Sequence, residues 1–518
     1  MLPLHLQPES HIPLYIQLRD QLRALVHSGE LRSGDRIPAS RELAGHLGVH
    51  RTTVSNAYAE LEAEGLIRGH VGRGTFICDS TARQFSPPPR GNGYGGNGGQ
   101  RGSMRWEALF ADERGDEGLS RLMPDIPPGA IAFTAARPSG ESFPVEEFRR
   151  CTNAVLRREG RRILQLGPSD GYERLKGAII DLLSGEGLNI HAGQLMITHG
   201  CQQAIDLICK AFLRPGDAVA LEDPAYPGAI AIFAGARVRM LSVRVETDSA
   251  RTERLGLDVE TLETVLLQNR VKLIFVTPDF HNPTGTVMPV ASRRRLLELA
   301  ARYQVPVVED GIYARLRLRG NGMPSLKTLD SAGHVIQIDS FSKIAFPGLR
   351  VGWCIGPETV IERLRLLKQA TDIHTDQLSQ AAMAEFIERG YLARHVAKMK
   401  RVYRNRLEAM EEALEEHMPD GSAWTHPEGG MSLWVTLPPG FDAGELLIHA
   451  RERGILFVPG RHFYLQHPQP NTLRLGFTSV DEARIARGIQ TFAEVVKSEL
   501  RKRQRGVREE SPARVALI

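Results

Sequence analysis

Hydrophobic residues near the beginning of the chain recur with the period of an α-helix. The pattern over residues 14–29 predicts one amphipathic helix. Two shorter helical patterns follow, one over residues 40–48, with Ser40 as the expected N-cap, and one over residues 49–65. Strand-like runs on both sides of a glycine-rich stretch, residues 69–74, then predict a β-hairpin.

From about Trp106 onward, short apolar runs alternate with helical patterns. This alternation predicts an α/β body whose mostly parallel sheet is covered by helices on both faces. A smaller α+β piece is expected from about Tyr403, with strands over residues 431–437 and 472–476. The strand candidates of the main sheet are residues 218–221, 273–276, 305–308, 335–338 and 351–355.

A stretch rich in proline and glycine, residues 86–103, has almost no apolar side chain to bury. Such a sequence predicts a tether, which at this length spans on the order of 25 Å root-mean-square. We therefore expect four parts, which are a head over residues 10–78, a linker over 79–105, a body over 106–500 and a basic tail over 501–518.

The composition is that of a soluble globular protein, with 42% hydrophobic and 24% charged residues. The chain begins with no basic and apolar leader, and no apolar run is long enough to span a bilayer, so no membrane association is expected. The five cysteines are scattered without a Cys-x-x-Cys pair, which predicts reduced thiols in the cytoplasm and no metal site. A net charge of +4 is too small to indicate nucleic acid by itself.

The first 78 residues have the element order of a helix-turn-helix followed by a β-hairpin wing. In such a unit the beginning of the second helix enters the major groove and contacts base edges and phosphates. A three-helix unit without a ligand has the same periodicity, so the pattern alone leaves that alternative open. The expected DNA contacts are Arg41 in the preceding helix, His50, Arg51, Thr52 and Thr53 at the start of the second helix, and Gly72 and Arg73 at the hairpin tip.

Reactive side chains follow the predicted strands of the body. Lys343 follows the strand over residues 335–338, and Asp310 and Tyr313 follow the strand over residues 305–308. They would lie at the carboxyl edge of a parallel sheet, where such folds bind ligands. A lysine for a Schiff base, a carboxylate for a ring nitrogen and a donor to a ring oxygen are what pyridoxal phosphate requires.

Other residues complete the requirements of the same cofactor. A glycine before an apolar helix leaves free amide groups at the helix N-terminus, where a phosphate binds. Each residue alone has an ordinary structural explanation, but their presence in one chain favours a cofactor site. The expected phosphate ligands are Gly200, Cys201, Gln202, Ser340 and Arg350; Tyr226 would stack on the ring, Asn282 would bond to the ring oxygen, and Arg474 would bind the carboxylate of an amino acid.

The head resembles the GntR family of winged-helix regulators. The resemblance is carried by residues 14–18 (LYIQL), 34–44 (GDRIPASRELA), 47–54 (LGVHRTTV) and 61–66 (LEAEGL). It implies that double-stranded operator DNA is bound through Arg41, Arg51, Thr52, Thr53 and the wing around Gly72. Ser55 stands where some members have a further basic residue, which affects the base preference.

The body resembles the fold-type-I aminotransferases of the aspartate aminotransferase superfamily over about residues 130–496. The motifs that carry this resemblance are Asn282-Pro-Thr-Gly285, Asp310-x-x-Tyr313, Ser340-x-x-Lys343 and Arg350. With the head, the whole chain is similar to the MocR/GabR family of regulators. That resemblance implies a domain-swapped, head-to-tail homodimer in which pyridoxal phosphate, alone or joined to an amino compound as an external aldimine, changes DNA binding.

Two positions depart from the family pattern. Leu166 aligns with a tyrosine that commonly reaches the cofactor phosphate of the partner subunit, and Ala136 stands where a glycine is common on the substrate side. By contrast, residues 427–431 and 458–460 look like those of a working amino-acid aminotransferase.

We therefore expect a cytoplasmic, nucleoid-associated transcription regulator that uses pyridoxal phosphate on Lys343 to sense an amino acid or related amine by aldimine exchange. Two alternatives stay open at this point. One is an active aminotransferase whose head is autoregulatory or localises the enzyme, and the other is a plain repressor whose body no longer binds a cofactor.

Overall fold

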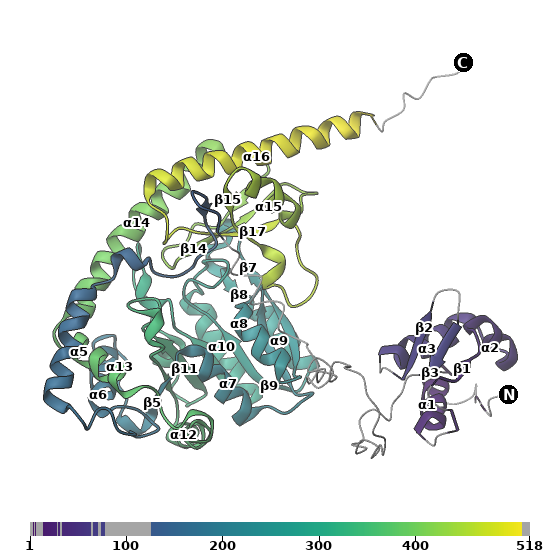
Figure 1. The fold of residues 1–518 in the computed structure, drawn as a ribbon, viewed down its shortest axis with the longest axis horizontal. Coiled ribbons are helices and arrows are strands. Elements are labelled where there is room, and N and C mark those ends of the chain that lie inside the picture. Colours follow the sequence, from purple (N-terminus) through teal and green to yellow (C-terminus); the bar gives the residue numbers. More distant parts are fainter. Residues whose placement is uncertain are drawn as a thin grey trace, which may run out of the picture. The chain divides into compact units, whose positions relative to one another are not determined.

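The computed structural model describes residues 14–27, 30–31, 34–63, 66–70, 74–77 and 126–509, together with Leu4 and Leu6. The chain forms two compact units, a head within residues 1–105 and a body within residues 106–518 (Figure 1). Gly72, Arg73, the expected linker over residues 79–105 and residues 510–518 of the expected tail lie outside the described residues.

The head consists of helices packed against a small antiparallel sheet with the strand order β1-β3-β2. Apolar residues from all three helices and from each strand form one core, which includes Leu18, Leu43, Val54, Ile67 and Ile77. The helical and hairpin patterns of the sequence are thus confirmed. The elements are α1 (Leu14–His27), β1 (Arg36–Ile37), α2 (Ser40–Leu47), α3 (Arg51–Ala63), β2 (Ile67–His70) and β3 (Gly74–Ile77).

The turn between α2 and α3 depends on a glycine. Gly48 has a φ of 63°, a left-handed conformation that costs glycine least, and its amide bonds back to the carbonyl of Ala44. At the other end of α2, Ala39 and not Ser40 is the N-cap, so that expectation was wrong. The amides of Glu42 and Leu43 both donate to the carbonyl of Ala39 at 2.9 Å, and the Tyr58 hydroxyl donates to the carbonyl of Pro38, directly before it, at 2.8 Å.

The body is built on an eight-stranded sheet with the order β5-β12-β11-β10-β9-β6-β7-β8. Most neighbouring strands are parallel, as predicted, but β12 runs antiparallel to both β5 and β11, and β8 runs antiparallel to β7. The strands are β5 (Leu195–Thr198), β6 (Ala218–Asp223), β7 (Arg239–Glu246), β8 (Gly256–Leu257), β9 (Val271–Val276), β10 (Val307–Asp310), β11 (Val335–Ser340) and β12 (Gly352–Ile355).

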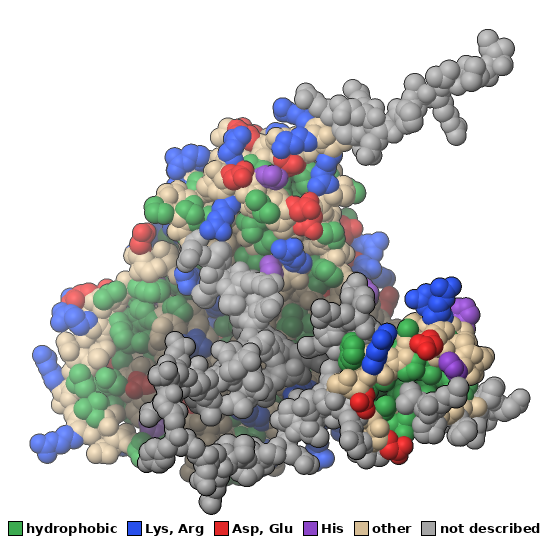
Figure 2. Space-filling model, turned by 45° about the vertical axis from the view of Figure 1, so that its right-hand side comes forward, with side chains coloured by type: hydrophobic (Ala, Val, Ile, Leu, Met, Phe, Trp, Pro, Cys, Tyr) green, Lys and Arg blue, Asp and Glu red, His purple; other side chains and the backbone are tan. Residues whose placement is uncertain are grey.

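Helices cover both faces of this sheet because its central strands are apolar on both sides. Leu273 and Phe275 of β9 face one core with α7, α8 and α12, whereas Ile274 and Val276 face a second core with α9 and α10. On the face of the body that Figure 2 shows, cations and anions are interspersed. The helices are α7 (Cys201–Phe212), α8 (Pro227–Gly235), α9 (Val259–Gln268), α10 (Val290–Tyr303) and α12 (Glu358–Asp372).

A small antiparallel sheet with the order β13-β14-β17-β16 forms the C-terminal part of the body. Tyr403, where this part was expected to begin, lies within α14, and α16 runs through residues 501–509, which were expected in the tail. The elements are α14 (Tyr391–His417), β13 (Ala423–Trp424), β14 (Ser432–Thr436), α15 (Ala443–Glu452), β16 (Val458–Pro459), β17 (Thr472–Gly476) and α16 (Glu482–Glu509).

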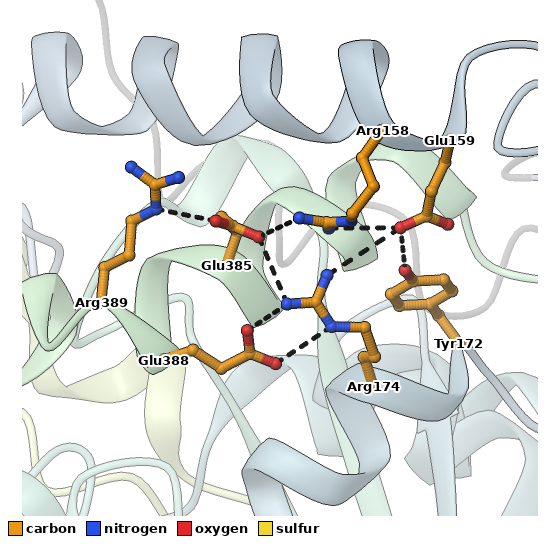
Figure 3. A network of polar contacts seen from close by, with 7 residues as sticks. All are labelled: Arg158, Glu159, Tyr172, Arg174, Glu385, Glu388 and Arg389. Atoms are coloured by element: carbon orange, nitrogen blue, oxygen red, sulfur yellow. Dashed lines mark hydrogen bonds and ion pairs between the residues drawn. The ribbon is translucent and has the colours of Figure 1, made fainter.

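Three further helices, α5 (Val145–Glu159), α6 (Glu173–Gly185) and α13 (Gln377–Glu388), are joined by a network of charged groups (Figure 3). The nearly buried carboxylate of Glu385 accepts hydrogen bonds from Arg158 at 2.7 Å, Arg174 at 3.3 Å and Arg389 at 2.7 Å. Arg174 also pairs with Glu388. Glu385 therefore connects the three helices electrostatically.

Replacement of Glu385 by Gln is expected to lower the free energy of unfolding by about 1–2 kcal/mol, because three arginines lose a shared carboxylate. Burial of Glu385 opposes ionisation, but hydrogen bonds from Arg158 and Arg389 outweigh burial and lower the pKa of Glu385. Because the pKa is lowered by folding, the contribution is complete at neutral pH and is lost in acid, as the pH falls through the lowered pKa. Urea unfolding of the wild type and the variant at neutral and at acidic pH measures this loss of stability. The control is Glu388→Gln, because Glu388 is more exposed. An equal or larger loss of stability in the control would contradict the prediction.

Candidate functional site

A cavity of about 300 Å³ opens at the carboxyl ends of the central strands. Its size is that of a small-molecule site. β10 ends at Asp310 and β11 at Ser340, and the parallel pairing of the two strands brings the loops that follow them together. The cavity is lined by seven of the residues singled out in the sequence, Cys201, Tyr226, Asn282, Asp310, Tyr313, Lys343 and Arg474.

Lys343 extends into this cavity from the loop after β11. Its Nζ donates to the carbonyl of Ala136 at 2.8 Å and lies 5.6 Å from the centre of the Tyr313 ring. Burial, with a further contribution from the positive charge of Arg474, lowers the pKa of Lys343 to about 8. A larger fraction of this lysine is therefore neutral, and hence nucleophilic, at physiological pH than of an exposed lysine.

Asp310 is buried at the end of β10, with its carboxylate towards the same cavity. Burial raises its pKa to about 7, while a hydrogen bond from the amide of Ile312 at 3.2 Å opposes the rise. A cation beside the other carboxyl oxygen would stabilise the ionised form of this buried group. The protonated ring nitrogen of pyridoxal phosphate is such a cation, so Asp310 fits the group.

A cradle for an anion is formed where α7 begins. Gly200 is the N-cap with φ 77° and ψ 173°, a conformation almost restricted to glycine, and an added Cβ would lie 2.5 Å from Nη2 of Arg350. The first amide groups of α7, those of Cys201 and Gln202, have no acceptor within the helix. Backbone N–H groups and a guanidinium converging on one point fit a phosphate.

Ser340 and Arg350 are connected through the loop between β11 and β12. The amide of Ser342 donates to Oγ of Ser340 at 3.2 Å, and Nη1 of Arg350 lies 3.4 Å from Oγ of Ser342. Nη2 of Arg350 donates to the carbonyl of His199, directly before Gly200, at 3.3 Å. The predicted phosphate residues from α7 and from the Lys343 loop therefore lie together.

The opposite side of the cavity carries the predicted carboxylate ligand. Arg474, buried in β17, donates to Oδ1 of Asn282 at 2.9 Å and to the carbonyl of Thr134 at 2.8 Å, and its guanidinium lies 5.0 Å from the centre of the Phe463 ring. Among the residues that the structure describes, its Nε has no hydrogen-bond partner, and burial lowers its pKa to about 10. A buried guanidinium with an unused donor fits a carboxylate.

Tyr226 is placed by an amide side chain. Its hydroxyl donates to Oε1 of Gln202 at 3.2 Å, and Nε2 of Gln202 donates to the carbonyl of Gly228 at 2.9 Å. The side chain of Gln202 therefore orients the aromatic ring, a role that the sequence did not suggest, and only its backbone amide is available for the phosphate cradle.

A buried acid–imidazole pair that was not expected from the sequence lies beside the cavity. Oε2 of Glu222 lies 3.4 Å from Nε2 of His281 and accepts from the amide of Thr277 at 2.8 Å, while Nδ1 of His281 lies 2.8 Å from Oγ1 of Thr284. Burial raises the pKa of Glu222 and lowers that of His281 to about 3. The only sequence signals were an acid ending an apolar strand and a histidine directly before Asn282.

The two departures from the family pattern lie in different surroundings. Ala136 lines the cavity and its carbonyl accepts from Lys343, so the methyl group that replaces a glycine hydrogen is at the site itself. Leu166 is 76% exposed and is not among the residues that line the cavity.

In the head, the predicted DNA contacts that fall on described residues lie on the surface. Arg41, His50, Arg51 and Thr52 are exposed, and Thr53 is half-buried. Nδ1 of His50 lies 2.8 Å from Oγ1 of Thr52, which stabilises the first turn of α3. Buried Val54 and Tyr58 fix the opposite side of the helix, so this polar end points outward.

Comparison with known proteins decides which family combines these parts. The body matches the family model for aminotransferase class I and II over residues 133–492, and the head matches that for bacterial regulatory proteins of the gntR family over residues 14–77. The chain is 31% identical over 502 residues to the HTH-type transcriptional regulator TauR from Rhodobacter capsulatus, covering 95% of this chain and 98% of TauR. The chain belongs to the MocR-type regulators.

The body of this MocR-type regulator is also similar to enzymes. It is 37% identical over 378 residues to aromatic-amino-acid aminotransferase 1 from Thermococcus litoralis, covering 72% of this chain and 89% of the enzyme. The chain is also similar to a solved structure, that of LysN, the α-aminoadipate aminotransferase from Thermus thermophilus, in complex with N-(5'-phosphopyridoxyl)-L-leucine. The two sequences are 33% identical. The two structures superpose with a TM-score of 0.69, over 77% of this chain and 100% of the LysN chain.

These likenesses confirm the predicted fold class, a winged helix-turn-helix fused to a fold-type-I pyridoxal-phosphate transferase domain with a small C-terminal part. They also confirm the predicted cofactor class, pyridoxal phosphate, and DNA as the partner of the head. Within the described residues, no helix is both apolar enough and long enough to cross a bilayer.

Replacement of Gly200 by Ala is expected to weaken retention of pyridoxal phosphate about tenfold or more, because the backbone conformation strains any other residue by about 1–3 kcal/mol. Cofactor absorbance after stepwise dialysis measures retention. Gly177→Ala is the matched control, because a Cβ there would meet nothing within 4 Å. Equal retention by the two variants would contradict the assignment of the cradle.

Proposed function

We propose that this protein is a pyridoxal-phosphate-dependent transcription regulator whose body binds an amino acid or related amine and whose head binds operator DNA. The observation that carries the proposal is the convergence of Lys343, Asp310 and Arg474 on one cavity in a chain that also has a GntR-type head. A DNA-binding regulator acts where the chromosome lies, so we place it in the cytoplasm, associated with the nucleoid.

Each residue of the cavity has a role in holding the cofactor. Bound pyridoxal phosphate supplies an aldehyde carbon that a lysine and an incoming primary amine can occupy in turn. Lys343 is the residue that holds this carbon, Asp310 pairs with the ring nitrogen, and Tyr313 and Asn282 donate to the ring oxygen. The phosphate is held by the amides of Gly200, Cys201 and Gln202, by Ser340 and by Arg350, with Tyr226 stacked on the ring.

Arg474 selects the effector. Its free Nε and its position beside Asn282 provide donors for a carboxylate on the effector side of the cavity. With Lys343 not bound to the cofactor carbon, the Nζ of this lysine would donate to the carbonyl of Ala136, as it does here at 2.8 Å. The displaced lysine is therefore stabilised inside the cavity.

The effector alters DNA binding only through a difference in its affinity for two states of the protein. We propose that these are states of a domain-swapped, head-to-tail homodimer, which the resemblance to the MocR/GabR family implies. Exposed Leu164 and Leu166 support a partner surface on the body, since large apolar side chains at 68% and 76% exposure gain from being covered.

Catalytic transamination is the second candidate function. It is favoured by the complete set of cavity residues and by the 37% identity to an aminotransferase. Repeated conversion of an amino acid and a keto acid into the exchanged pair would identify an enzyme. A single stoichiometric spectral change would identify a sensor.

Replacement of Lys343 by Ala is expected to abolish the response of DNA binding to the effector, because the group that the effector displaces is gone. Effectors are first found by screening amino compounds for a change in the visible spectrum of the wild-type protein. Gel-shift assays on the promoter beside the gene then measure the response. An unchanged response in Lys343→Ala would refute aldimine exchange as the signal.

Replacement of Arg51 by Ala is expected to weaken operator binding by about 1–3 kcal/mol, because a guanidinium is lost from the end of the recognition helix. Fluorescence anisotropy at fixed salt measures the affinity. The control is Arg19→Ala in the same head, because Arg19 pairs with Glu60 at 2.6 Å and so has an intramolecular role. If both variants bound DNA like the wild type, this face of the head would not be the DNA-binding face.

A further inference from the structure

A hollow of about 710 Å³ in the body has six cations among the twelve residues that line it. Its lining has a single acidic side chain, Asp217. We call it the basic hollow. Its cations are Lys210, Arg214, Arg239, Arg270, Lys272 and Arg363.

The basic hollow lies at the amino ends of the parallel strands. Arg239 begins β7, Arg270 directly precedes β9, and Asp217 directly precedes β6, while Arg363 comes from α12. The cavity that contains Lys343 lies at the carboxyl ends of the same strands. The basic hollow is therefore separate from the cofactor site and is used by nothing in the function proposed above.

Few of these cations are neutralised by the protein. Lys210 forms an ion pair with Asp206 at 2.7 Å. Oδ2 of Asp217 accepts a hydrogen bond from the backbone amide of Arg214 at 2.8 Å. The structure gives no ion pair, within the part of the chain that it describes, to the other five cations, Arg214, Arg239, Arg270, Lys272 and Arg363.

The face shown in Figure 2 has cations and anions interspersed, as expected of a surface selected only for solubility. Six cations around one concave surface repel one another, and a concave basic surface attracts polyanions. Five of the six side chains are exposed, so their charged ends are accessible to a large partner.

Guanidinium groups bind phosphate oxygens through paired hydrogen bonds. The cations come from four separate segments around the hollow and are not gathered about one buried point, which suits a row of phosphates better than one small anion. The same chain carries a DNA-binding head, so duplex DNA is the polyanion that it meets. We infer that the basic hollow binds the phosphate backbone of DNA that flanks the operator site bound by the head.

This inference rests on the proposed function, because the head must bring the body to DNA. It adds a contact that is independent of sequence and sensitive to salt. Each phosphate contact contributes about 0.9 to the slope of log affinity against log salt, so the contact is measurable by titration.

The test compares two triple variants of the full-length, cofactor-loaded protein. The first, Arg239→Gln with Arg270→Gln and Arg363→Gln, removes three cations of the basic hollow. The matched control, Arg451→Gln with Arg453→Gln and Arg487→Gln, removes three exposed arginines from the α15–α16 region. In Figure 1 that region lies at the opposite end of the body from α7 and α12.

The probes are two duplexes from the promoter beside the gene. Footprinting defines the operator; the short duplex contains only the base pairs that the head needs, and the long duplex adds about 20 base pairs, or two helical turns, on each side. We expect the wild type and the control triple to bind the long duplex about tenfold more tightly than the short one. The triple variant of the basic hollow (the hollow triple) should bind both duplexes with the same affinity, and its binding of the short duplex should equal that of the wild type. On the long duplex, the slope of log affinity against log salt should fall by roughly one for each phosphate contact removed.

The possible results separate this inference from the function on which it rests. Failure of the wild type to bind the short duplex would overturn the DNA-binding function itself. Equal wild-type binding of both duplexes, or a hollow triple that keeps the difference and the slope, would overturn only the role of the basic hollow. Cofactor absorbance of both triples shows that the body is folded in each case.

Discussion

The body depends on the side-by-side pairing of β10 and β11 inside a sheet that is buried on both faces. Parallel pairing aligns Asp310 with Ile338 and ends both strands at the same edge, so a carboxyl group and the loop that carries Lys343 emerge together. Both strands are buried along their whole length, so the ionisable side chains at their ends are shielded from water. The cavity therefore holds an acid of raised pKa and a lysine of lowered pKa, and a ligand with charges of both signs is the most direct way to satisfy them.

The fold was largely predictable because its signals are local. Apolar runs of four or five residues separated by helical patterns mark a parallel sheet, and motifs at strand ends such as Asp310-x-x-Tyr313 mark its carboxyl edge. The antiparallel β12 was not predictable, because a buried strand has the same composition in either direction. The expected boundary near Tyr403 falls inside a helix, since the helical period continues through it in α14.

The site was predictable as a set of residues but not as a network. Lys343, Asp310 and Arg474 could be named because their chemistry matches one cofactor, whereas their partners are contacts between distant segments. The carbonyl of Ala136 and the amide of Gln202 became visible only in three dimensions, as did the approach of His281 to Glu222. Backbone acceptors and buried neutral pairs leave almost no trace in a sequence, because residues of many types can supply them.

The length of α14 has a mechanical consequence. Its 27 residues form a rod of about 40 Å. The rod packs against α13 near one end and along α16 towards the other. A helix of this length turns largely as one unit, so a rotation at its α16 end would displace its α13 end by a larger distance. The geometry of α14 is thus that of a lever arm between two parts of the body.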